Sequence, residues 1–170
     1  MPSHRIRAAR RAAILAGVAA AALFAADGFS AGAAQAQGAP ANAREQAAFD
    51  VRFLQTEFMV AALSCGRPDY QNYYNTFVTR FGAPLKRHAD VLKSHFTREY
   101  GKQGMNKLDS FATKLANEAS LRSMQQVTFC QDTGLVMERV SGLDSASLDS
   151  FSTSFARSIE TVAVIEPAKR

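Results

Sequence analysis

The chain has 170 residues, of which 47% are hydrophobic, with 20 Lys and Arg against 15 Asp and Glu. This length suits a single domain and excludes a large multidomain enzyme. The composition also excludes a disordered chain, a collagen-like fibre and a cysteine-dense miniprotein.

Residues 1–36 have the pattern of a secretory signal peptide. Four arginines within residues 1–11 precede an unbroken apolar run over residues 12–26, and Ala34-Gln35-Ala36 follows. This is the basic, apolar and A-x-A order of an export signal. The run has 15 residues, fewer than the ~20 of a membrane-spanning helix, which disfavours an uncleaved anchor. We predict cleavage after Ala36, with Ala33 or Ala34 as alternatives, by the general secretory route rather than the twin-arginine route.

Removal of this segment changes the charge of the protein. Without the four arginines and Asp27, the chain keeps 16 basic and 14 acidic side chains, a net charge of +2. A charge this small gives no electrostatic reason to expect nucleic-acid binding. No later segment approaches the length of a membrane span, so we expect a soluble mature protein.

The mature chain keeps two cysteines, Cys65 and Cys130. An even number of cysteines in an exported chain indicates a disulfide, and two buried free thiols are the alternative. The wide spacing excludes a CxxC redox motif and a CxxCH haem attachment site. We predict a Cys65–Cys130 disulfide that pins two helices together.

The mature chain has helical periodicity and no sustained strand alternation. We expect a flexible leader at 37–43, a helical bundle domain at 44–165 and a polar tail at 166–170. The predicted fold is all-α, a compact bundle of four to five helices pinned by one disulfide. The expected helices cover residues 44–64, 70–100, 105–117, 120–140 and 146–163, and the alternative is that the third and fourth are continuous through Ala119.

Local signals set the expected helix boundaries and faces. Pro84 interrupts the region 70–100 and is expected to kink or break it. Asp69 and Ser145 are predicted to cap the helices that follow them. Met124 and Val127 are expected on the inner face of the region 120–140, together with Cys130 and either Leu135 or Met137.

Two small sets of side chains are candidates for binding. Tyr73 lies off the main apolar stripe of its helix, with Arg67 and Asn72 nearby, and these three are possible contacts for a partner. The alternative is that the aromatic residues of this region only pack the core.

The second set comprises possible ligand-binding or pH-sensitive residues: His88, His95, Glu99 and Met59. Two histidines seven residues apart on a helix lie about 10 Å apart along its axis and cannot share one ion, so we expect no metal site. Met59 with either histidine could ligate a haem, but we expect no cofactor. A histidine at a helix interface could still respond to mild acid.

The sequence carries no recognised catalytic motif, so we expect a protein without catalytic activity. GxSxG, HExxH and glycine-rich phosphate loops are absent from the sequence, and the acidic residues are dispersed. The predicted disulfide would occupy both cysteines, which leaves no thiol nucleophile.

The stretches 53–67 (FLQTEFMVAALSCGR) and 108–120 (LDSFATKLANEAS), with the later cysteine in TFC, resemble small exported helical proteins of alphaproteobacteria. The resemblance implies export and paired cysteines, but no activity. The alanine-rich signal fits a GC-rich Gram-negative host, so the expected location is the periplasm. We expect a non-enzymatic helical protein that binds an envelope protein or assists envelope stress responses; the alternative is a carrier of a small ligand, haem or metal.

Overall fold

A computed structural model of the protein describes residues 42–165. The predicted signal peptide, most of the leader and the polar tail lie outside the described residues. Those that are described belong to one compact unit of the chain.

This part of the chain forms six α-helices and contains no strand, which confirms the predicted all-α bundle. The region 70–100 is divided into two helices, as the interruption near Pro84 indicates. In chain order the elements are α1 (Ala43–Ser64), α2 (Pro68–Arg80), α3 (Gly82–Tyr100), a 3-10 turn η1 (Gly101–Gln103), α4 (Gly104–Gln125), α5 (Phe129–Ser141) and α6 (Leu148–Ile165). None of these helices is long and apolar enough to cross a membrane.

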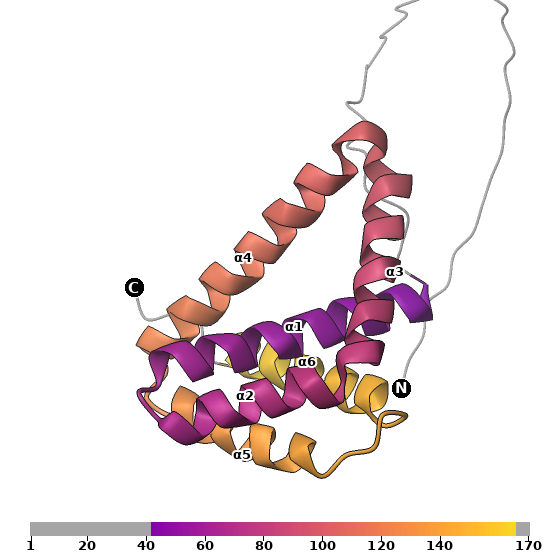
Figure 1. The fold of residues 1–170 in the computed structure, drawn as a ribbon. Coiled ribbons are helices and arrows are strands. Elements are labelled where there is room, and N and C mark those ends of the chain that lie inside the picture. Colours follow the sequence, from indigo (N-terminus) through magenta and orange to yellow (C-terminus); the bar gives the residue numbers. More distant parts are fainter. Residues whose placement is uncertain (1–41, 166–170) are drawn as a thin grey trace, which may run out of the picture. The chain divides into compact units, whose positions relative to one another are not determined.

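Helix α1 is the centre of the arrangement. It begins at a capping box in which Asn42 and Glu45 exchange side-chain-to-backbone hydrogen bonds. The five other helices of this part of the chain all pack against it. Figure 1 shows α1 between α3 and α4 on one side and α2 and α5 on the other. Because neighbours surround α1, its buried residues are distributed around the helix rather than along a single stripe.

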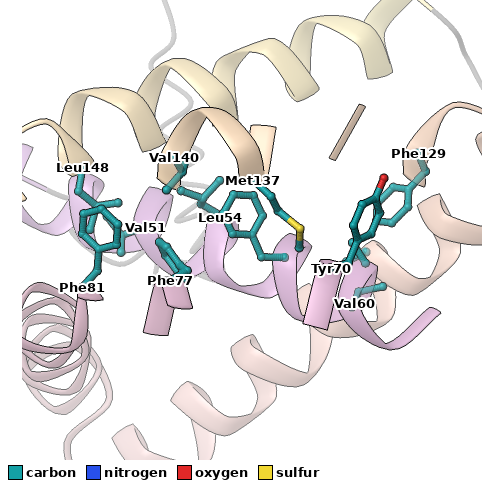
Figure 2. Close-up of a cluster of buried hydrophobic side chains, with 13 residues drawn as sticks. Val51, Leu54, Val60, Tyr70, Phe77, Phe81, Phe129, Met137, Val140 and Leu148 are labelled. Atoms are coloured by element: carbon teal, nitrogen blue, oxygen red, sulfur yellow. The ribbon is translucent and has the colours of Figure 1, made fainter. Parts of the chain in front are cut away.

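The main hydrophobic core lies between α1, α2, α5 and α6 (Figure 2). Phe58, Phe77 and Phe81 pack edge-on or tilted against one another, with ring centroids 5.2–5.3 Å apart. Leu148 brings the first turn of α6 into the same cluster. The buried faces of these helices therefore meet in one core.

Helices α3 and α4 form two arms that meet at their far end (Figure 1). Gly101 ends α3 with a φ of +53°, a left-handed conformation that favours glycine. Phe96 and Phe111 pack together between the arms, and both contact Phe49 of α1. These aromatic contacts hold the arms against the central helix.

Several local predictions differ from the structure. Helix α4 is continuous through Ala119, as the alternative predicts, but it ends at a break over residues 126–128 that lies inside the expected helix 120–140. Met124 is 74% exposed and Val127 fully exposed, so neither lies on an inner face. Asp69 lies inside the first turn of α2 instead of capping it, because Pro68 already begins the helix. Ser145 lies in a turn before α6, where Asp144 accepts a hydrogen bond from the Ser147 backbone at 2.8 Å.

The Cys65–Cys130 disulfide is present, with the two Cα atoms 5.6 Å apart. It joins the C-terminal end of α1 to the first turn of α5 across a sequence separation of 65 residues. In the chain-entropy model, closing a loop of this length stabilises the fold by about 4 kcal/mol. At the other end of α5, Arg80 donates hydrogen bonds to the carbonyls of Ser141 and Leu143, so α5 is fastened to its neighbours at both ends.

Three carboxylates of α1 are buried, and each meets a different helix. Glu45 accepts hydrogen bonds from α3, Asp50 accepts one from Thr153 of α6 at 2.7 Å, and Glu57 pairs with Arg122 of α4. A buried carboxylate is costly unless it has partners. These contacts therefore select which helix lies against each part of α1.

The Glu57–Arg122 pair is the most buried of these contacts. Glu57 is 1% exposed, and burial raises the pKa of its carboxyl although Arg122 opposes the shift. The Arg122 guanidinium also stacks over Phe53, 5.3 Å from the ring centroid. Arg122 thus supplies both a counter-charge and packing area.

Replacing Arg122 with alanine should lower the free energy of unfolding by about 3 kcal/mol, because it leaves the Glu57 carboxylate buried without its partner. Urea unfolding followed by circular dichroism measures this. Lys114→Ala on the same helix, which breaks the exposed pair with Glu118, should cost less than about 1 kcal/mol.

The double variant Glu57→Leu, Arg122→Leu should recover most of the lost stability, because apolar packing replaces both charges. Equal losses in the Arg122 and Lys114 variants would contradict a structural role for the buried pair.

Candidate functional site

A shallow depression between α2 and α5 is the candidate site. Its cavity volume is about 520 Å³, and it lies beside the disulfide. Two of the predicted partner contacts, Arg67 and Tyr73, line it, whereas Asn72 is exposed but is not among the lining residues. The structure therefore brings together two of the three predicted residues.

Arg67 is held in a defined position at the edge of this depression. Its Nη2 atom lies 2.9 Å from Oδ2 of Asp69, and its guanidinium lies 5.1 Å from the ring centroid of Tyr70. Hydrogen bonding to Arg67 lowers the pKa of Asp69. The edge thus combines a cation, a carboxylate and two neighbouring tyrosines, Tyr70 and Tyr73.

The floor of the depression depends on close contact between Tyr70 and α5. The Tyr70 hydroxyl donates a hydrogen bond to the carbonyl of Cys130 at 2.7 Å. The Tyr70 ring lies so close to Gly134 that a Cβ there would be 2.1 Å from the hydroxyl oxygen. Gly134, which weakens a helix locally, is required here for packing.

Sequence reasoning missed the α5 side of the depression. Leu135 is 60% exposed and lines it together with Glu138. The helical pattern allowed either Leu135 or Met137 on the inner face, and Met137 is the buried one. The available signal was spacing, because residues two positions apart do not share a helix face, so Leu135 and Met137 could not both face the core.

The two predicted histidines lie in separate polar contacts. His95 Nδ1 is 3.1 Å from Oε2 of Glu45, and Arg98 donates to the other oxygen of the same carboxylate at 2.7 Å. Glu99 accepts a hydrogen bond from Arg98 at 2.9 Å. His88 Nε2 is 2.8 Å from Oδ1 of Asp149 on α6. Both histidines thus link helices far apart in the sequence.

Met59 is placed away from these histidines. It lines a pocket between α1 and α2 with Leu63 and Tyr74, whereas His88 lines a different cavity, between α1, α3 and α4. A haem held by Met59 and His88 is therefore not supported by this geometry. Within residues 42–165, no group of three or more His, Cys, Asp or Glu side chains is arranged to hold a metal ion.

The Glu45 contacts couple the fold to pH. Hydrogen bonding to Arg98 is the largest cause that lowers the pKa of Glu45 from 4.5 to about 2; desolvation opposes it, and His95 and the Asn42 backbone act in the same direction as Arg98. A carboxyl whose pKa is lowered in the folded state stabilises the fold while it is ionised. Its contribution is complete above pH 4.5 and is lost as the pH falls toward 2.

We predict that Glu45→Gln unfolds more easily than the wild type at neutral pH, because it lacks the carboxylate that Arg98 and His95 bind. The stability difference should shrink between pH 4.5 and about 2, as the wild-type carboxyl becomes protonated. Urea unfolding over this pH range measures the difference.

Glu57→Gln is the matched control, and its stability difference from the wild type should change with pH in the opposite direction. Because burial raises the pKa of Glu57, its ionisation opposes folding, and this variant should gain stability relative to the wild type as the pH rises above 4.5. A Glu45→Gln difference that is constant over pH would contradict the coupling.

The depression carries an ion pair and a disulfide at its edge. Arg67 and Asp69 neutralise each other, and both cysteines are in the disulfide. A scan against protein-family models, a search of curated proteins and a search of solved structures found no match to this chain.

Proposed function

We propose that this chain is an exported, non-enzymatic protein of the periplasm that binds another protein of the cell envelope or assists envelope stress responses. The export pattern of residues 1–36 and the disulfide support the location. The absence of recognised catalytic motifs from the sequence supports a binding role.

The depression between α2 and α5 is the observation that carries the proposal. It combines an arginine, a tyrosine and an exposed leucine: Arg67, Tyr73 and Leu135. Arginine and aromatic residues are enriched at protein interfaces and dominate their binding energy. The depression is wide and shallow, which suits a protein surface better than an enclosed small molecule.

Its walls are fixed before any partner arrives. The disulfide attaches α5 to α1, and the Tyr70–Cys130 hydrogen bond attaches α5 to α2. A surface that does not need to be ordered on binding loses less conformational entropy in the complex. The rigid floor therefore favours specific recognition.

Export is tested by the intact mass of the protein isolated from its own host, with and without reductant. We expect an N-terminus near Gln37 and a mass two hydrogens lower before reduction, as one disulfide requires. A protein that retains residues 1–36, or that carries free thiols when isolated, would contradict export to an oxidising compartment.

Partner binding is tested with a photo-crosslinking amino acid placed at Tyr73 or Leu135 of the full-length chain in its host. Both positions should yield the same discrete crosslinked product, because they line one surface. The exposed α3 positions Lys93 and Thr97 are controls and should not yield it. Mass spectrometry identifies the attached protein.

A second substitution separates recognition from chance proximity. Arg67→Ala should reduce the Tyr73 crosslink about tenfold, because a charged contact at a buried interface contributes ~1.5 kcal/mol or more. Arg87→Ala, which removes an exposed arginine from α3, should leave the crosslink unchanged. Equal products from control positions would contradict the proposed surface.

A further inference from the structure

A separate cavity of about 180 Å³ lies between α1, α3 and α4. Its apolar walls include Val51, Leu92 and Leu108, one from each helix, and Arg52, His88 and Asp109 supply the charged or titratable groups. None of these residues lines the depression between α2 and α5. The cavity is therefore a distinct feature of the fold.

The walls of this cavity belong to regular helices. The lining positions of α1 are 48, 51, 52 and 55, and those of α3 are 85, 88, 89 and 92. Residues three and four apart lie on one face of a helix. Two continuous helix faces therefore line the space, and α4 closes a third side through residues 108, 109 and 112.

Arg52 provides a cation at the wall of the cavity that is available to a ligand. It is half-buried, and its Nη1 atom donates to Oε1 of Gln55 at 3.3 Å, a long contact with a neutral partner. Among the residues that the structure describes, no carboxylate forms an ion pair with Arg52. A guanidinium binds a carboxylate through two parallel hydrogen bonds when one is supplied.

His88 adds a buried polar surface to the same cavity. Its side chain is nine-tenths buried, and Asp149 of α6 holds its Nε2 atom at 2.8 Å. The ring is thereby fixed in orientation at the cavity wall. Asp109 is the acidic residue of the lining and is exposed on α4.

The geometry points to a binding site for a small monocarboxylic acid, whose apolar body lies among Val51, Leu92 and Leu108 and whose carboxylate pairs with Arg52. A cavity of about 150 Å³ is large enough for a benzene ring, so this one has room for a single ring or a short branched chain. Asp109 would repel a second negative charge, which limits the ligand to one carboxylate.

This site does not depend on the proposed partner surface. A ligand in this cavity would lie on another side of α1. A failure of partner binding would therefore leave the ligand site intact, and a failure of ligand binding would leave the partner surface intact. It would make the protein a carrier or sensor of small organic acids.

The test uses the mature protein and benzoate as the probe, with benzyl alcohol as the neutral match of similar size. Binding is followed by two-dimensional NMR at about pH 7, where benzoate is ionised. We expect saturable shifts of amides in residues 48–55, 85–92 and 108–112, and at least tenfold weaker binding of benzyl alcohol. No saturation up to about 10 mM benzoate, or equal affinity for both probes, would overturn the proposal.

Variants of the two charged lining residues should change the affinity for benzoate in opposite directions. Arg52→Gln should weaken benzoate binding about tenfold, because it removes the charge-assisted hydrogen bonds. Asp109→Asn should strengthen binding, because it removes a like charge. Arg87→Gln is the control, since it changes the net charge equally from an exposed position. Weaker binding in the Asp109 variant would overturn the assignment in favour of a cationic or zwitterionic ligand.

A blocking variant tests the location of the site. Ala112→Phe should fill the cavity and abolish the shifts, whereas Thr113→Phe adds the same ring on an exposed part of α4. Thermal unfolding shows whether each variant is folded. Unchanged binding by a folded Ala112 variant would place the ligand elsewhere and overturn the proposal.

Discussion

The burial of α1 on all sides is the constraint on which the structure depends. Every other helix packs against it, and its three buried carboxylates each require a partner from outside the helix. Arg98, Thr153 and Arg122 supply those partners from three different helices. An apolar surface would allow several orientations of these helices, whereas a buried carboxylate tolerates only the one that supplies its donor.

The disulfide extends this arrangement to the candidate surface. It holds the first turn of α5 against the end of α1, and Tyr70 then closes the contact between α2 and α5 over Gly134. The depression is the exposed side of that contact. Core packing and the proposed binding surface therefore share a residue, because Tyr70 is buried in the core cluster and also lines the depression. The cavity on the other side of α1 is also lined by regular helices, whose continuous faces form its walls.

Much of the fold could be predicted from the sequence, because helical periodicity reports burial directly. Leu54 and Phe58, which are four residues apart on α1, are both buried, and the predicted Cys65–Cys130 disulfide is present. The errors lie where a short-range signal was ambiguous. Val127 continued the apolar spacing but lies in the α4–α5 turn and is fully exposed. Periodicity finds an apolar face, but it does not say where one helix ends when no glycine or proline marks the break.

The same distinction between local spacing and helix packing applies to the candidate sites. The sequence by itself determined the helical class, the cysteine pair and the local proximity of Arg67 and Tyr73, because these follow from spacing along the chain. Only the tertiary structure decided that Leu135 lies beside them and that Glu45 reaches His95, since these residues come from helices whose packing the sequence pattern does not encode. The cavity at Arg52 has the same origin: it exists because three helix faces, each ordinary in sequence, converge.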